Sequence, residues 1–537
     1  MNYALDRRDF LRTVGLAAAS LAVNGCAGAS KWGHMKAPVK RPNIVLVMAD
    51  DMGFADLGCY GSEINTPNLD RLAADGLRFT QFYNTARCCP TRASLLTGLY
   101  PHQAGVGGMT DGRGDVNPTG PYQGYLNDKC VTIAEVLKTA GYTTLMAGKW
   151  HVGETRPHWP VDRGFDHYYG LISGAANYFD ITKGKRQCIT RRFAIDGKPH
   201  VPAPKNFYIT DAFTDNAIKF LDRYAAADKP FFLYLAYTAP HWPLHAWPDD
   251  IARYKGKYIK GWDELRKQRY KRMIDMGIID PKWKLSPRDE GAVPWESVED
   301  KELMDHKMAV YAAQIDRMDQ NIGKVLAKLK DMGAEDNTLV MFLSDNGACH
   351  ETGPLGFDNR KNGLPPGGVD SYMSYGQSWA NAGNTPFRMF KKYTHEGGIA
   401  TPFIARWPAI IKNKGALTSQ VGHIIDVMAT CVDVAGADYP TQYKGRQIIP
   451  PQGKSLLPVF AVAQRKGHEY LFWEHQTHEA VRNGKWKLVA SRRGNWELYD
   501  IEADRTELND LADKHPDIVR RLKTKYEQWA AGVGVRI

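Results

Sequence analysis

The chain has 537 residues, of which 43% are hydrophobic and 24% are charged, and its formal net charge is +11. This composition is typical of a globular protein long enough for one large and one smaller domain. Eight cysteines in a chain of this length do not form a disulfide framework. The positive charge suits anionic substrates, but it is a weak functional signal. We expect no nucleic-acid partner.

The N-terminus is typical of an export signal. Arg7 and Arg8 precede an apolar run over residues 14–23, which is too short to span a membrane as a mature helix and indicates a twin-arginine signal peptide. Residues 1–30 should therefore lie outside the fold, with the Tat machinery as a partner and a bacterial periplasmic or cell-surface location. Cys26 ends a lipoprotein-like box; a lipid anchor there and a soluble exported enzyme cleaved nearby are alternatives. No later segment is apolar over about 18 residues, so no membrane-spanning domain is expected.

Strands alternate with helices along the first 440 residues. Asn43 to Ala49 is a continuous apolar run that ends at two acids, as expected for a buried parallel strand. Similar strand patterns occur at Thr143 to Ala147, Phe231 to Tyr237 and Thr338 to Leu343, and helical patterns occur at Thr132 to Thr139, Asp211 to Tyr224 and His306 to Met332. The alternation predicts a layered α/β domain over residues 40–440.

Two polar regions interrupt this alternation, residues 242–300 and residues 354–385. We predict them as loops, either as solvated insertions or as carriers of substrate contacts. After residue 440 the pattern changes to short strands. These are predicted at Tyr470 to Glu474, Glu479 to Ala490 and Trp496 to Ile501, with turns at Asn483-Gly484 and Gly494-Asn495 and a helix from Pro516 to Ala530. Residues 441–537 should form a small antiparallel α+β domain.

Acidic side chains follow two of the predicted parallel strands. Asp50 and Asp51 follow the first, and Asp345 and Asn346 follow another. Because parallel strands place their carboxyl ends along one crevice, we expect these groups to converge. Three carboxylates together need a cation, and oxygen ligands favour calcium or magnesium over zinc. Taken singly, such pairs more often cap helices or form turns.

The most specific motif is Cys88-Cys89-Pro90-Thr91-Arg92, followed by Thr97-Gly98. Pro90 and the apolar run after it indicate that Cys88 lies just before a helix, where free N–H groups and the helix dipole favour an anion. On its own, the motif is also compatible with a buried cysteine pair at a turn.

The motif resembles the signature of the formylglycine-dependent sulfatases, in the alkaline-phosphatase-like superfamily, and the resemblance extends over roughly residues 40–530. In that family a maturation enzyme oxidises the cysteine to formylglycine. The aldehyde hydrates to a diol, so that one hydroxyl attacks sulfur and the other later expels sulfate. The resemblance implies an α/β fold with a large mixed, mostly parallel sheet between helices. It also implies a formylglycine-generating enzyme as a partner and one calcium ion per chain.

The resemblance implies the metal ligands residue by residue. Asp50, Asp51, Asp345 and Asn346 match the calcium ligands, and modified Cys88 completes the set. Asp345 should also help to activate the attacking hydroxyl.

The resemblance also implies roles for the basic residues. Arg92 should hold the formylglycine, and Lys149 and Lys391 should bind sulfate. His151 should assist the elimination of sulfate, and His241 should protonate the leaving group. Sulfate ester cleavage needs cations around the non-bridging oxygens and a proton for the leaving oxygen, which these residues could supply. Taken alone, each such histidine or lysine is usually structural or solvated.

Two features depart from the family pattern. A second cysteine, Cys89, stands where serine or alanine is common, and the stretch before Ala480 is unusual. We therefore predict that His478, in that stretch, touches substrate. The segments 254–263 and 308–313 look closest to bacterial arylsulfatases.

The leading hypothesis is a sulfuric ester hydrolase acting on a sulfated carbohydrate or an aryl sulfate. The second is a phosphonate or phosphate ester hydrolase of the same superfamily. The third is an anion-binding or redox-active protein in which Cys88 is never modified.

Overall fold

The computed structural model describes residues 41–110, 119–184, 191–225 and 229–536. The predicted signal peptide and Cys26 lie outside these residues. The described residues belong to one compact unit, Pro38–Ile537. The predicted domain boundary near residue 440 stays a prediction.

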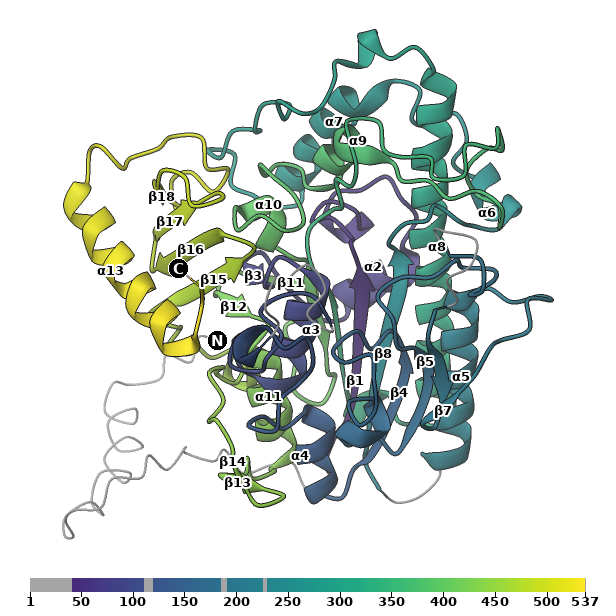
Figure 1. Ribbon diagram of the computed structural model, residues 1–537, viewed down its shortest axis with the longest axis vertical. Helices are drawn as coiled ribbons and strands as arrows, with labels where there is room; N and C mark the ends of the chain where they lie inside the picture. Colours follow the sequence, from purple (N-terminus) through teal and green to yellow (C-terminus); the bar gives the residue numbers. More distant parts are fainter. Residues whose placement is uncertain (1–40, 111–118, 185–190, 226–228, 537) are drawn as a thin grey trace, which may run out of the picture. The chain divides into compact units, whose positions relative to one another are not determined.

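A ten-stranded sheet forms the centre of the large layered part of the chain (Figure 1). Strand β1 (Asn43–Asp50) lies between β8 (Phe231–Pro240) and β9 (Thr338–Ser344), and all three are parallel. Strand β4 (Thr143–Gly148) continues the parallel pairing beyond β8 and is followed by β5 (His167–Leu171). These central strands are almost wholly buried, which explains their continuous apolar sequences.

Shorter strands extend the sheet at both edges and make it mixed. They are β10 (Phe403–Arg406), β2 (Leu77–Phe79) and β11 (Ala416–Thr418) beyond β9, and β6 (Phe193–Ile195) and β7 (Lys198–Pro199) beyond β5. Strand β10 is antiparallel to β9, and β6 is antiparallel to β5. Two separate small sheets pair β3 (Phe82–Tyr83) with β12 (Gly422–His423) and β13 (Gln442–Tyr443) with β14 (Arg446–Gln447).

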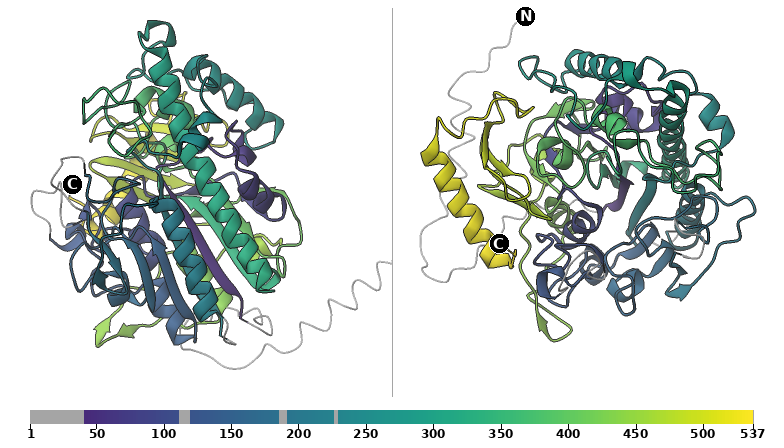
Figure 2. Two further views of the ribbon diagram at one scale, coloured as in Figure 1. Left: turned by 90° about the vertical axis from the view of Figure 1, so that its right-hand side faces the viewer. Right: turned by 45° about the horizontal axis from the view of Figure 1, so that its top comes forward.

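Helices cover the sheet on both faces (Figure 2). One group packs together as α2 (Pro67–Ala74), α5 (Ile209–Tyr224) and α8 (Lys301–Asp331), and the other as α3 (Cys88–Thr97), α4 (Ile133–Thr139) and α11 (Asp426–Ala435). Helix α8 begins at Lys301 rather than at the predicted His306, because the Asp300 side chain caps its N-terminus. Within the described ranges, none of the helices has the length and apolar character needed to cross a membrane.

The two regions predicted as loops contain helices, so this prediction was wrong in part. Residues 242–300 include α6 (Pro248–Ala252) and α7 (Gly261–Asp275), and residues 354–385 include α9 (Gly376–Gly383). Helix α7 buries Arg269, whose guanidinium lies 2.6 Å from Asp56 and 2.8 Å from Glu63. A helix that buries charged residues lacks the apolar periodicity by which helices are recognised.

The C-terminal part has the predicted antiparallel character. Its four-stranded sheet runs in chain order as β15 (Leu471–His475), β16 (His478–Asn483), β17 (Trp486–Ala490) and β18 (Glu497–Asp500), and α13 (Pro516–Val533) packs against it. Within the predicted segment 479–490, strands β16 and β17 meet at the predicted turn, where Gly484 has φ +57°.

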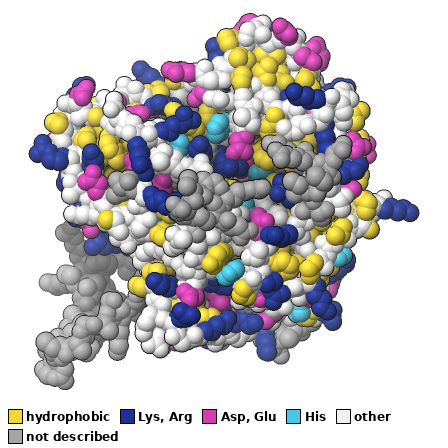
Figure 3. Space-filling model, in the orientation of Figure 1, with side chains coloured by type: hydrophobic (Ala, Val, Ile, Leu, Met, Phe, Trp, Pro, Cys, Tyr) yellow, Lys and Arg dark blue, Asp and Glu magenta, His cyan; other side chains and the backbone are white. Residues whose placement is uncertain are grey.

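The remaining helices α10 (Glu396–Ile399) and α12 (Leu457–Phe460) are each one turn long. On the face shown in Figure 3, Lys and Arg side chains are spread among acidic ones. The net charge of +11 therefore does not gather into one stripe on this face.

Candidate active site

The carboxyl ends of the central strands carry the predicted site residues. Asp50 is the last residue of β1, Asp345 follows β9, Lys149 follows β4 and His241 follows β8. All four side chains are buried. Gly148 allows β4 to pass close to β8, because a Cβ there would lie 2.0 Å from the carbonyl oxygen of Ala236. Parallel pairing thus brings together groups that lie far apart in the sequence.

Cys88 is the first residue of α3 rather than the residue before it. Arg87 precedes it in an extended conformation, and the helix ends at Gly98, which has φ +70°. Cys88 is only 2% exposed. The first-turn N–H groups of α3 and its dipole create a local preference for negative charge at this position.

Three buried carboxylates and an amide, Asp50, Asp51, Asp345 and Asn346, form what we call the acid cluster. The Asp51 backbone N–H donates to Asp345 Oδ1 at 3.1 Å, and the Asn346 amide donates to Asp51 Oδ1 at 2.7 Å. Each carboxylate also has a cation beside it, with closest N–O distances of 2.6 Å for Lys149–Asp50, 2.6 Å for Lys391–Asp51 and 2.7 Å for Arg92–Asp345. Arg92 also lies 3.8 Å from Asp50.

Two oxygens of the acid cluster fit a metal ligand role. Asp50 Oδ1 and Asn346 Oδ1 are buried and have no hydrogen-bond partner among the described residues. Unpaired buried acceptors are costly, so a pair of them beside three carboxylates favours the binding of another group there. Burial raises the pKa of Asp50, and burial together with the charge of Asp50 raises the pKa of Asp345 to about 8. A hard cation such as calcium would relieve this crowding.

Cys88, Cys89 and His151 lie together at the start of α3. One ligand atom from each lies within 4.8 Å of the others, and His151 Nε2 is 3.8 Å from Cys89 Sγ. A hydrogen bond from Cys89 lowers the pKa of Cys88 well below its usual value. Burial lowers the pKa of His151 to about 4, so its ring is neutral near pH 7.

His241 faces the acid cluster from the end of β8. Its Nε2 lies 3.4 Å from Asp51 Oδ2, and its Nδ1 lies 2.6 Å from the carbonyl oxygen of Trp242. Because a carbonyl can only accept, Nδ1 carries a proton and Nε2 is the atom free to exchange one with a ligand. Burial lowers the pKa of His241 to about 4, although the charge of Asp51 raises it.

The sulfatase family profile matches residues 42–437, which is more than half of the chain. The chain belongs to the sulfatase family. A second profile, the C-terminal region of N-sulphoglucosamine sulphohydrolase, matches residues 386–531.

Individual sulfatases are similar over most of the chain. An uncharacterized sulfatase of Schizosaccharomyces pombe is 36% identical and covers 94% of this chain and 96% of its own. An arylsulfatase of Klebsiella aerogenes is 36% identical and covers 80% of this chain and 94% of its own. This sulfatase is accordingly an enzyme, a sulfuric ester hydrolase.

Solved structures share the fold. Ps i-CgsB in complex with k-i-k-neocarrahexaose is 27% identical with a TM-score of 0.67, and the match covers 91% of this sulfatase and 93% of that chain. The phosphonate monoester hydrolase of Agrobacterium radiobacter, 18% identical with a TM-score of 0.58 over 92% and 96% of the two chains, is similar in fold alone. The predicted alkaline-phosphatase-like α/β fold is confirmed.

His478 lies in the C-terminal sheet, on β16 opposite His475. Its ring centroid is 4.4 Å from that of Tyr393, and within the described ranges neither of its ring nitrogens has a hydrogen-bond partner. Its contact with substrate stays a prediction.

Two residues near the site were missed by the sequence analysis. Arg87 and Glu351 form an ion pair of 2.7 Å, and Trp242 donates to Glu351 at 3.3 Å. The pair thus joins the residue before Cys88 to the residue after His241. Adjacency to Cys88 was a signal for Arg87, whereas Glu351 belongs to no motif.

Proposed function

We propose that this sulfatase removes sulfate from a sulfated carbohydrate, using formylglycine made from Cys88 and a calcium ion held by the acid cluster. The observation that carries the proposal is the convergence of Cys88, at the N-terminus of α3, with Asp50 and Asp51, each of which a buried lysine contacts. The substrate class is supported by relatives. The human N-acetylgalactosamine-6-sulfatase is 29% identical over 83% of this chain, and Ps i-CgsB binds neocarrahexaose.

When present, calcium supplies positive charge beside the sulfate oxygens and hydrated formylglycine supplies the attacking hydroxyl. The chain's own residues position and neutralise the sulfate. Lys149 and Lys391, both buried, place ammonium groups beside the acid cluster, where they can bind non-bridging sulfate oxygens. Arg92 donates twice to Asp345 Oδ2, at 2.7 and 3.1 Å, and so fixes the carboxylate that is proposed to accept the proton of the nucleophile.

Proton transfer to the leaving oxygen is proposed for His241. The hydrogen bond from Nδ1 to the Trp242 carbonyl orients Nε2 toward the site. A bound sulfate beside the ring favours the imidazolium and keeps Nε2 protonated, which offsets the lowering of the His241 pKa by burial. His151, within reach of Cys88, is the group proposed to take up a proton when sulfate is released.

The decisive test compares substrates on the purified enzyme, with the peptide mass at Cys88 confirming the aldehyde. Wild type should release sulfate from N-acetylgalactosamine 6-sulfate or sulfated neocarrahexaose, and from 4-nitrophenyl sulfate, with higher kcat/KM than for matched phosphate and phosphonate esters. A preference for the phosphonate ester would favour the alternative hydrolase. Cleavage of the aryl sulfate alone would contradict the carbohydrate assignment.

We also propose export by the Tat route, based on Arg7 and Arg8. Replacing both with lysine should leave the protein in the cytoplasm, as measured by fractionation of a native-like host. Arg12→Lys is the matched control and should be exported. Normal export of the double variant contradicts the signal assignment. The mass of the mature N-terminus decides whether Cys26 carries a lipid.

A further inference from the structure

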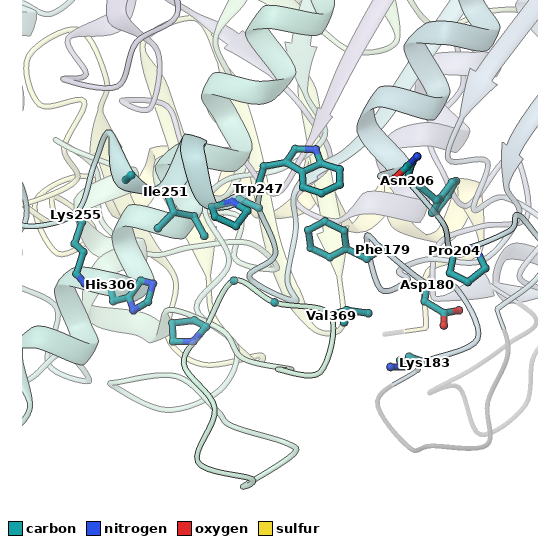
Figure 4. A pocket seen from close by; sticks show the side chains of 17 residues that line it. Phe179, Asp180, Lys183, Pro204, Asn206, Trp247, Ile251, Lys255, His306 and Val369 are labelled. Carbon is teal, nitrogen blue, oxygen red and sulfur yellow. The ribbon is translucent and has the colours of Figure 1, made fainter.

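A cavity lies apart from the acid cluster (Figure 4). Its walls come from α6, from the first turns of α8 and from loops around residues 179–183, 204–207 and 366–369. Its volume is about 790 Å³, within the range of roughly 300–1,000 Å³ usual for ligand pockets. The residues proposed above for catalysis and metal binding do not line it.

The cavity has aromatic side chains in the middle and cations toward both ends. In Figure 4, Trp247 and Phe179 lie centrally, Lys255 and His306 lie on one side, and Lys183 lies on the other. The two central rings are in contact, with centroids 5.0 Å apart. Sugar rings have apolar faces that pack on aromatic rings, and their sulfate or carboxylate groups pair with lysine, so this layout fits an anionic sugar.

The aromatic wall is held rigidly. Trp247 Nε1 donates to Asp211 Oδ2 at 3.2 Å, and Arg317 contacts the same carboxylate at 2.7 Å. Acidic groups are also present, because Asp180 lines the cavity and Lys183 pairs with Asp370 at 2.6 Å. The positive charge at the opposite end comes from Lys255, because burial and the charge of Lys255 lower the pKa of His306 below its usual value.

The cavity is close enough to the active site for one ligand to reach both. Trp247 is six positions after His241, and six extended residues span at most about 20 Å. On the other wall, the hydroxyl of Tyr178 contacts the carbonyl oxygen of His241 at 2.8 Å, and the next residue, Phe179, lines the cavity. His241, the proposed proton donor, is therefore connected to the cavity wall twice, through the short segment to Trp247 and through the contact with Tyr178.

We propose that this cavity binds a second, negatively charged sugar unit of the same carbohydrate chain whose sulfate ester is cleaved at Cys88. The inference rests on the proposed function, since it deepens the substrate class from a sulfated sugar to an oligosaccharide. A second contact on one chain makes binding at the first site effectively intramolecular. Oligosaccharides should thus bind more tightly than monosaccharides.

Two variants change the cavity in different ways, and each has a matched control. Lys255→Glu reverses an exposed charge at one end, and Lys267→Glu makes the same change on α7, away from the cavity. A Cβ at Gly368, which lines the cavity, meets no heavy atom within 4 Å, so a side chain can begin there and Gly368→Trp adds bulk at the cavity wall. Gly467, which is equally open but lies elsewhere, gives the control Gly467→Trp.

The readouts are KM for sulfated neocarrahexaose and for 4-nitrophenyl sulfate, with calorimetric titration of the hexasaccharide. Lys255→Glu should raise the hexasaccharide KM about threefold to tenfold, the effect of losing one or two exposed charged contacts. Gly368→Trp should raise it as well, because its ring takes up space that the sugar would occupy. They should leave the aryl sulfate KM unchanged, and the controls should change neither.

Equal hexasaccharide affinities for the cavity variants and their controls would overturn the inference, as would a lack of hexasaccharide binding by the wild type. If the enzyme binds the hexasaccharide but does not cleave it, the proposed substrate is wrong, while the cavity inference is still open to the titration. The titration still decides the cavity, because a loss of binding in Gly368→Trp but not in Gly467→Trp supports it.

Discussion

Two clusters of fully buried charge in this sulfatase differ in how completely they are paired. The first is the acid cluster at the strand ends. The second, which we call the linking cluster, consists of Glu396, Lys487, Arg505 and Glu507 and joins α10 to the C-terminal sheet. In the linking cluster each carboxylate oxygen lies within 3 Å of a nitrogen. Glu396 Oε1 is 2.9 Å from Lys487, Glu396 Oε2 is 2.9 Å from Arg505, and Glu507 Oε2 is 2.9 Å from the Glu396 backbone N–H. Glu507 Oε1 lies 2.8 Å from the Lys487 ammonium as an ion pair, without a hydrogen bond among the described residues.

The acid cluster, in contrast, keeps two acceptors without donors among the described residues, Asp50 Oδ1 and Asn346 Oδ1. Burial and charge are the same in both places, so neither of them marks a binding site. Acceptors without a donor are costly to bury, so their presence among converging carboxylates favours a bound cation there. The comparison assigns stability to the linking cluster and chemistry to the acid cluster, and variants can separate the two.

The largest effect on turnover is expected beside the acid cluster, at Cys88. Cys88→Ala should abolish sulfate release from aryl and sugar substrates, because no other group can form the aldehyde-derived diol, and Cys88→Ser should permit at most one slow sulfation. Cys89→Ser is the neighbouring control and should stay active. Steady-state rates and the mass of the Cys88 peptide check this, and an active Cys88→Ala enzyme would rule out the mechanism.

Metal removal should have the next largest effect on turnover, and it should depend on the acid cluster and not on the linking cluster. A strong chelator should remove activity, and calcium should restore it better than zinc because all the protein ligands are oxygens. Calcium should also raise the Tm of the wild type, since a ligand that binds only the folded state stabilises it. Asp345→Ala should lose that Tm shift, whereas Glu396→Gln should keep it. Full activity of metal-free enzyme would contradict the assignment.

Substitutions of the basic residues around the acid cluster should differ in whether their effect on the rate depends on the substrate. His241→Ala should cost about 100- to 10,000-fold with a sulfated sugar, whose alkoxide needs a proton, and little with an activated aryl sulfate. Lys149→Ala and Lys391→Ala should each cost roughly 100- to 1,000-fold with both substrates, because their charge acts on the sulfate itself. Measured kcat/KM values decide this. Equal losses for His241→Ala on both substrates would remove it as the leaving-group acid.

The linking cluster should affect stability and hardly affect turnover. Glu396→Gln leaves Lys487 and Arg505 without their shared carboxylate and should lower the unfolding free energy by about 3–5 kcal/mol, while kcat per folded molecule stays near the wild-type value. The exposed Glu502 provides the control Glu502→Gln, which should change stability by less than about 0.5 kcal/mol. Denaturant unfolding with active-site titration checks both.

The pH dependence of this effect has a definite sign. Burial alone would raise the pKa of Glu396. The charges of Lys487 and Arg505 outweigh burial and lower the pKa from its usual 4.5 to about 2. A carboxyl whose pKa is lowered by folding contributes stability above its unfolded pKa and loses it as the pH falls. The difference between wild type and Glu396→Gln should therefore shrink between pH 4.5 and pH 2. A constant difference over that window would contradict the pairing.

Much of the site could be predicted because its residues follow apolar strands directly. The run from Asn43 to Ala49 predicts a buried parallel strand, and the parallel order then predicts that Asp50 lies near Asp345. Helix α7 and the ion pair of Arg87 with Glu351 were not predicted. The interacting side chains, Arg269 in α7 and Arg87, are charged, and the partners lie 206 and 264 positions away, respectively, so no local pattern predicts these contacts.

The sequence by itself determined which chemistry the chain carries: the Cys88 motif, the acids at strand ends and the alternation of strands and helices that brings them to one edge. These features are local, since periodicity and strand termination depend on neighbouring residues. Only the tertiary structure decided which cation pairs with which carboxylate, which acceptors are left unpaired, and that α6, α8 and three distant loops line a cavity apart from the acid cluster. Pairing and enclosure depend on contacts between residues hundreds of positions apart, and these exist only once the layers have packed.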